Sequence, residues 1–274
     1  MDPIFIACLL VLGAAVGFAA GLLGIGGGML MVPFLTMLFT WQQMPLELVV
    51  HAAIATSMTS ILFTSISSVW AHHRKGAVRW KIVAMMAPGI IIGGLISGGA
   101  VFAALNTAWL SLAFALFVGY SAYKMLSSKK PAPSRQMPGV VGSSAAGAGI
   151  GFISGLVGAG GGFVSVPFMT WCNVALHNAV ATSAALGFPI ALANSVGYIF
   201  AGLNETGGQP GMLGFIYLPA LACLVVVSVL TAPFGARVAH QLPVASLKKV
   251  FACLLFVLAA YMLYKAGVAF AAGA

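Results

Sequence analysis

The feature that most constrains this chain is a series of long apolar runs without a charged residue. The first run spans residues 4–39. Several of the runs exceed the roughly 20 residues that a helix needs to cross a hydrocarbon core of about 30 Å. Because 61% of the 274 residues are hydrophobic and only 5% are charged, the sequence predicts an all-α polytopic membrane protein. The later runs are 48–71, 82–105, 109–125, 140–172, 174–201, 212–236 and 250–264.

The chain contains an internal repeat. Residues 17–36 read GFAAGLLGIGGGMLMVPFLT and residues 151–170 read GFISGLVGAGGGFVSVPFMT, with 12 of 20 positions identical. A second match pairs HAAIATS at 51–57 with HNAVATS at 177–183. We therefore expect two transmembrane repeats, residues 1–126 and 139–274. They are joined by a basic, proline-containing cytoplasmic linker at 127–138.

The glycine cluster interrupts the first apolar run of each repeat. As one helix, residues 4–39 would be about 54 Å long, which is too long for a single crossing. The glycines divide the run into a longer piece, 4–21, and a short piece, 29–40. We interpret the unit as a broken-helix hairpin with a glycine tip, which enters and leaves on the same side. Three transmembrane helices follow in each repeat, so the second repeat is inverted relative to the first.

The basic residues favour the inverted arrangement. With the N-terminus outside, 11 of the 12 Lys and Arg residues face the cytoplasm and only Lys265 lies outside. If the glycines merely kinked a crossing helix, the repeats would be parallel and the distribution would be 9 inside and 3 outside. Positive charge concentrates in cytoplasmic loops, so inversion is preferred.

Inverted repeats with interrupted helices are typical of transporters, whose substrate sites lie where half-helix ends meet. The N-terminus of a helix presents unpaired N–H groups and a partial positive charge, and glycine lets an anion approach that backbone closely. Close helix packing is the alternative role for such glycines. The predicted backbone contacts to an anion are Gly26, Gly27, Gly28 and Met29 in the first repeat and Gly160, Gly161, Gly162 and Phe163 in the second.

Polar side chains in the following helices are further candidates. Their hydroxyl groups would donate hydrogen bonds to an oxyanion, or would instead bond to their own helix. The candidates for substrate binding are Thr56, Ser57, Thr182, Ser183 and Asn194. His51 and His177, near the helix starts, are candidates for gating or a proton-linked role, with capping as the alternative.

Several function classes are disfavoured by the residue inventory. The only carboxylates are Asp2, Glu47 and Glu205, and no paired acids or metal-ligand motif accompanies them, so we expect neither an enzyme, nor a cofactor, nor a metal site. The net charge of +9 reflects residues beside helix ends and does not indicate nucleic-acid binding. The expected partners are the lipid bilayer and a small anion, and an oligomer is possible.

The doubled G-x-x-G-x-G-G-G motif followed by V-P-F, the A-T-S of the next helix and PFGARVAHQLP at 233–243 together resemble the TauE/SafE family of anion exporters. The resemblance extends over essentially the whole chain. It implies a multi-pass protein of the cell membrane, mostly bacterial, that exports sulfite or an organosulfonate such as sulfoacetate. The expected function is therefore secondary transport of a small anionic sulfur compound. A passive anion channel of the same architecture is the alternative.

Overall fold

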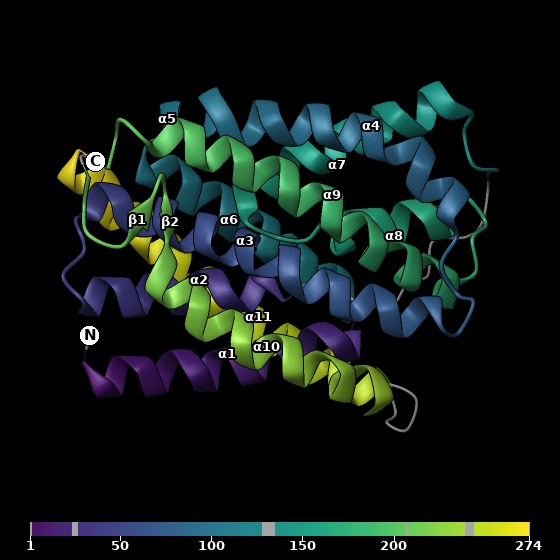
Figure 1. Ribbon diagram of the computed structural model, residues 1–274, viewed down its shortest axis with the longest axis horizontal. Coiled ribbons are helices and arrows are strands. Elements are labelled where there is room, and N and C mark those ends of the chain that lie inside the picture. The colour runs from purple at the N-terminus through teal and green to yellow at the C-terminus, as the bar shows by residue number, and fades with distance from the viewer. Residues whose placement is uncertain (1, 24–26, 128–134, 207, 239–243, 274) are drawn as a thin grey trace.

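Figure 1 shows the protein, in a computed structural model, as a bundle of helices. The structure describes residues 2–23, 27–127, 135–206, 208–238 and 244–273, without the side chains of residues 22, 23, 236–238, 244–248 and 250. Within these ranges the regular structure is helical, apart from two short antiparallel strands, β1 (Met212–Leu213) and β2 (Ile216–Tyr217).

Eight segments among the described residues are long and apolar enough to cross a membrane. Six of them are α1 (Pro3–Leu23), α3 (Leu46–His73), α6 (Thr107–Leu126), α7 (Val140–Val157), α9 (Leu176–Gly202) and α10 (Leu218–Val238). The others are α11 (Val244–Ala272) and a composite of α4 (Trp80–Ile96), the π-helix η1 (Ser97–Val101) and α5 (Phe102–Ala104). Two shorter helices, α2 (Gly28–Trp41) and α8 (Gly162–Trp171), follow the glycine clusters. The chain is therefore a multi-pass membrane protein.

The outward faces of the long helices are apolar. Val141 of α7 is 83% exposed, Phe200 of α9 is 71% exposed and Val226 of α10 is 62% exposed. A surface with large apolar side chains on so many helices is stable only where something other than water covers it. A lipid bilayer provides that cover, in agreement with the expected class.

The short helices begin at the residues that the glycine clusters predict. Gly27 precedes α2 with φ of 67°, and Gly161 precedes α8 with φ of 74°. Side chains rarely adopt this left-handed conformation, whereas glycine adopts it freely. A glycine in this conformation therefore precedes a short helix at the same position in both repeats.

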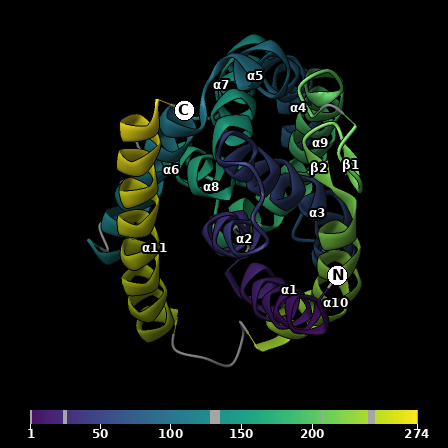
Figure 2. The same ribbon diagram turned by 90° about the vertical axis from the view of Figure 1, so that its left-hand side faces the viewer.

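Helices from the two predicted repeats pack against each other in an exchanged pattern. Helix α1 packs along α10, and α7, which corresponds to α1 in the sequence repeat, packs along α4. The corresponding helices α3 and α9 pack together, as do α6 and α11. Figure 2 shows α6 and α11 side by side along one flank of the bundle. Neither repeat therefore forms a core of its own.

The two ends of the bundle differ in what they contain. Both chain ends lie at the same end of the bundle as β1 and β2 (Figure 1). The connection between α3 and α4, residues 74–79, lies at the opposite end (Figure 1). The first end is called the strand end below, and the second the basic end, because Arg74, Lys75 and Arg79 belong to this connection.

The composite helix α4–η1–α5 is interrupted at the strand end. Gly99 has a non-helical backbone (φ −87°, ψ −118°), and Leu105 is extended (φ −85°, ψ 126°). The chain then turns, and Asn106 caps α6 by accepting a hydrogen bond from the Trp109 N–H at 3.1 Å. The last carbonyl groups of a helix have no partner within it, so the turn after α5 presents acceptors to its neighbours.

Candidate functional site

Each of the two glycine clusters lies close to a residue of the preceding helix. A Cβ atom at Gly27 would lie 2.5 Å from Val16 Cγ1 of α1, and one at Gly161 would lie 3.1 Å from Ile150 Cγ2 of α7. Val16 and Ile150 occupy equivalent positions in the sequence repeat. At Gly27 and at Gly161 the chain thus lies close to a residue 11 positions earlier in the sequence.

The start of α2 lies directly against the second glycine cluster. A Cβ at Gly28 would lie 2.1 Å from the Gly158 carbonyl oxygen and 3.1 Å from Ala159 Cα. The Ser57 hydroxyl of α3 also reaches this carbonyl, at 3.4 Å. The first N–H groups of α2 have no intrahelical partner. Unpaired helix donors from one repeat therefore lie next to the glycine turn of the other.

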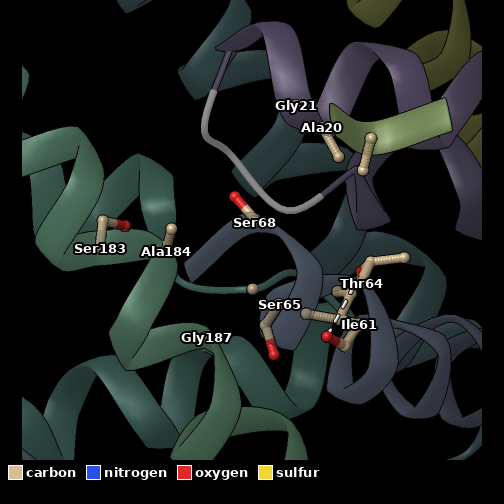
Figure 3. A pocket seen from close by; sticks show the side chains of 11 residues that line it. Ala20, Gly21, Ile61, Thr64, Ser65, Ser68, Ser183, Ala184 and Gly187 are labelled. Atoms are coloured by element: carbon tan, nitrogen blue, oxygen red, sulfur yellow. Dashed lines mark hydrogen bonds between the residues drawn. The ribbon is translucent and has the colours of Figure 1, made fainter. Parts of the chain in front are cut away.

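A small cavity lies beside this contact, and Figure 3 shows it from close by. Its volume is about 20 Å³, which is enough for one water molecule but not for a sulfonate. No charged side chain lines it. It is bounded by residues of α1, α3, α9, α10 and the second glycine cluster: Ala20, Gly21, Ile61, Thr64, Ser65, Ser68, Gly160, Ser183, Ala184, Gly187 and Ala232.

The hydroxyl groups at the cavity differ in whether they have a proton to offer. Thr64 and Ser65 donate to carbonyl oxygens of their own helix, Ser65 to Leu62 at 2.9 Å. Ser183 bonds instead to the Ser165 hydroxyl of α8, at 2.7 Å. A hydroxyl is one donor and two acceptors, so within this pair only one proton is used. The Ser165–Ser183 contact therefore differs from those of Thr64 and Ser65, whose protons go to backbone carbonyl oxygens.

The two threonines of the A-T-S stretches are engaged elsewhere. Thr56 Oγ1 accepts the backbone N–H of Tyr217 at 3.0 Å, and Thr182 Oγ1 accepts that of Arg79 at 3.0 Å. Both N–H groups stand directly before a helix, α10 in one case and α4 in the other. Because their N–H groups lack an intrahelical partner, these threonines serve as matching caps at opposite ends of the bundle.

Asn194 is fully buried, but it does not reach the cavity. Its amide donates to the Ile190 carbonyl at 2.8 Å and to the Gly151 carbonyl of α7 at 3.4 Å, while its Oδ1 has no hydrogen-bond partner. A Cβ at Gly155 would lie 2.0 Å from this Oδ1. The contact of an amide with a glycine backbone is typical of close helix association in membranes.

The two histidines have opposite surroundings. His51 is 6% exposed, and both of its ring nitrogens contact backbone carbonyl oxygens. His177 is exposed at the start of α9. Its neighbour Asn178 donates a hydrogen bond of 2.7 Å to the Ala77 carbonyl at the basic end. The repeat therefore places equivalent histidines in environments that are not equivalent.

The structure thus brings only some of the predicted residues together. Gly160 and Ser183 line the cavity, and Gly27, Gly28, Gly161 and Gly162 form the adjoining helix starts. Met29 is buried in the core and Phe163 packs against that core. Gly26 lies outside the described residues. Thr56, Thr182, Asn194 and His51 are engaged in other contacts.

Cavity residues of α3 and α9 were not predicted from the sequence. They include Thr64, Ser65, Ser68 and Gly187. Hydroxyl residues recur every three or four positions along α3, which indicates a polar face of a helix. The spacing of the hydroxyl residues is visible in the sequence, but it does not identify which turn of α3 contacts the other repeat.

No three His, Cys, Asp or Glu side chains of the described residues gather into a group that could hold a metal ion. The carboxylates Glu47 and Glu205 are exposed. The chemistry at the cavity is therefore that of hydroxyl groups and backbone amides.

Comparison with known proteins identifies the family of this chain. The family model described as sulfite exporter TauE/SafE matches residues 9–262. A "Probable membrane transporter protein" of Haemophilus influenzae is 36% identical over 266 residues, covering 97% of this chain and 100% of the relative. A protein of the same description from Methanocaldococcus jannaschii is 26% identical, covering 93% and 94% respectively. No solved structure matches. The chain therefore belongs to the TauE/SafE family and is a membrane transporter.

Proposed function

We propose that this protein is a secondary carrier that exports a small anionic sulfur compound, sulfite or an organosulfonate such as sulfoacetate. The observation that supports this most is the cavity beside the contact between Gly28 and Gly158. It is bounded by both predicted repeats, has no charged side chain and adjoins two helix starts. Helix N-termini attract anions through their N–H groups and dipole.

An inverted-repeat architecture is part of the proposal. Each repeat begins with a glycine-tipped hairpin, α1–α2 or α7–α8. The exchanged packing of α1 with α10 and of α7 with α4 supports a two-fold relation between the repeats. Rocking one set of helices against the other would open the cavity to either side in turn.

The cavity volume favours a carrier over a channel. About 20 Å³ is too small for the proposed substrate, so the described conformation does not accommodate the substrate in this cavity. A carrier passes through such a state in every cycle, whereas a channel conducts through a continuous path. The counterflow experiment below separates the two.

The orientation of the protein in the membrane is inferred from its basic residues, and the driving force for transport from the charge of the substrate. We propose that the basic end faces the cytoplasm of a bacterial cell and that the strand end faces outward. The membrane potential, negative inside, favours anion efflux by about 2.3 kcal/mol per charge per 100 mV. Export can therefore proceed without a sodium ion.

The test is counterflow in liposomes that contain the purified protein. Vesicles loaded with unlabelled sulfite should take up labelled sulfite faster than empty vesicles, and saturably. Sulfoacetate and sulfolactate added outside should compete if they share the site. Unsaturable conductance would favour the channel, and absence of flux with all three anions would contradict the substrate class.

Gly187→Ala probes the cavity without straining the backbone. The new Cβ would lie 3.5 Å from Ser65 Cβ, an ordinary contact, and would occupy cavity space. Alanine is also the better helix former, so stability should stay equal or rise by about 0.4–1 kcal/mol while flux falls. Gly119→Ala in α6 is the matched control, since its Cβ would lie 3.9 Å from Ala259. Equal flux in the two variants would remove the cavity from the transport path.

A further inference from the structure

His51 lies at the strand end among three carbonyl oxygens. Its Nδ1 is 3.0 Å from the Glu47 oxygen, one turn earlier in α3. Its Nε2 is 3.2 Å from the Phe102 oxygen and 2.9 Å from the Leu105 oxygen, both at the turn after α5. Carbonyl oxygens only accept hydrogen bonds, so both ring nitrogens face acceptors.

Both ring nitrogens donate only in the doubly protonated ring, although the Glu47 oxygen also accepts a hydrogen bond from the Thr107 hydroxyl at 2.7 Å. A neutral imidazole carries one N–H, and its second nitrogen is an acceptor whose lone pair would then point at a carbonyl oxygen. The imidazolium donates from both nitrogens, and such charge-assisted hydrogen bonds are about twice as strong as neutral ones. The acceptors therefore favour the protonated form, whereas burial of the ring, the largest influence on its charge, opposes it.

Burial opposes a charge at His51, so the groups facing it matter. The Glu205 carboxylate, in the connection after α9, interacts electrostatically with the ring and favours its charge. Glu47, on the same helix, contributes its carbonyl oxygen. The nearby Tyr198 hydroxyl of α9 donates to the Gly155 carbonyl and is not directed at the ring. The facing groups are thus acceptors and one carboxylate, with no cation among those described.

The ring also joins three segments that are distant in sequence. It stacks on Phe215, between β1 and β2, with centroids 5.0 Å apart and planes at 27°. It meets the Phe102 ring edge-on, with centroids 5.0 Å apart. The start of α3, the turn after α5 and the strand connection thus converge on one side chain. We call His51, Phe102, Leu105 and Phe215 the His51 latch.

We propose that His51 is a proton-binding site, and that the bound proton holds the strand end closed through the His51 latch. Loss of the proton converts the imidazolium to imidazole, and the proton passes to water at this end. One N–H···O contact is thereby replaced by a repulsive one, so the latch weakens. The proposal rests on the proposed transport function only in treating the strand end as a gate.

Nuclear magnetic resonance of the full chain in nanodiscs, with ¹⁵N-labelled histidine, tests the proton directly. At about pH 5.5, below the usual histidine titration near 6.5, the His51 ring should show two N–H correlations, assigned by their absence in His51→Gln. A single-tautomer ring across the range from about pH 5 to about pH 8 would overturn the proposal. The titration is read from the wild type, and the variant serves only to assign the His51 signals.

Hydrogen exchange of the backbone tests the latch. After correction for intrinsic rates, amides of residues 102–107 and 212–217 should lose protection about ten- to a hundredfold in His51→Gln. In the wild type, protection should be full at low pH and fall as pH rises past the titration of His51. His177→Gln, in an exposed equivalent histidine, should behave like the wild type. Equal pH dependence in His51→Gln and the wild type would contradict the latch.

The transport measurement stands apart from these two. If sulfite counterflow fails in the wild type, the proposed substrate class is wrong. The His51 proposal is then still decided by the ring N–H signals and by the hydrogen-exchange protection at the strand end. If flux is present, His51→Gln should remove its dependence on external pH, and unchanged dependence would exclude His51 as the gate proton site.

Discussion

The two predicted repeats use equivalent glycines and threonines in the same way and equivalent histidines in different ways. Gly27 and Gly161 make the same turn, and Thr56 and Thr182 cap equivalent helices. His51 is buried, whereas His177 is exposed. Duplication thus accounts for the common framework, and the later divergence lies at the ends.

The reason for the divergence is visible in the connections. Residues 74–79 join α3 to α4 directly, whereas residues 203–217 join α9 to α10 and include β1 and β2. The longer connection brings Phe215 onto His51 and contains Glu205. The extended connection thus gives His51 surroundings that His177 lacks.

The largest expected effect is at the turns that both repeats share. Gly27→Leu and Gly161→Leu should each abolish flux and lower stability, by about 1–3 kcal/mol from backbone strain and about 1–3 kcal/mol from overpacking. Thermal unfolding in detergent and counterflow measure the two effects. Gly76→Leu is the control, because Gly76 has φ of 64° with no atom within 4 Å of its Cβ position. Full flux in both cluster variants would refute the turn assignment.

The next effect concerns the matched caps. Thr56→Val and Thr182→Val should each lower stability by about 0.5–1.5 kcal/mol, because a part-buried backbone N–H at a helix start loses its acceptor. The two values should agree, measured by thermal unfolding. Thr170→Val is the control, since its hydroxyl bonds only to its own helix. A large difference between the two variants would break the equivalence of the caps.

The serines that follow these threonines, Ser57 and Ser183, should contribute unequally to transport. Ser183→Ala should reduce flux severalfold with little change in unfolding temperature, because Ser183 lines the cavity and shares a proton with Ser165. Ser57→Ala should have a smaller effect on flux, since Ser57 only contacts the Gly158 carbonyl at 3.4 Å. Saturation curves for sulfite decide this, and the reverse order would move the binding site to the first repeat.

The smallest effect is expected at Lys265. Its ammonium group donates to Thr40 Oγ1 at 3.1 Å, at the end of α2. This contact lies on the side where the charge distribution places no other basic residue. Lys265→Gln should lower stability by less than about 1 kcal/mol, as partly exposed charges do, and leave flux unchanged. Thermal unfolding and counterflow test this, and a strong loss of flux would assign Lys265 to the substrate path.

The candidate site was only partly predictable because periodicity does not identify partners. One helix contains the hydroxyl residues Thr56, Ser57, Thr64 and Ser65. Their spacing alone does not show which of them lines the candidate site. Thr56 meets a backbone N–H 161 residues away, whereas Thr64 reaches the cavity. A local pattern contains no information about contacts over such separations.

By itself the sequence determined the membrane class, the family and the residues at which α2 and α8 begin. These follow from hydrophobic run length and from glycine, whose missing side chain acts locally. Only the tertiary structure decided that Gly28 meets Gly158, that Ser183 rather than Asn194 reaches the cavity, and that His51 faces three carbonyl oxygens. Each of these depends on how helices from opposite repeats pack, and packing is set by the whole set of contacts rather than by any one segment.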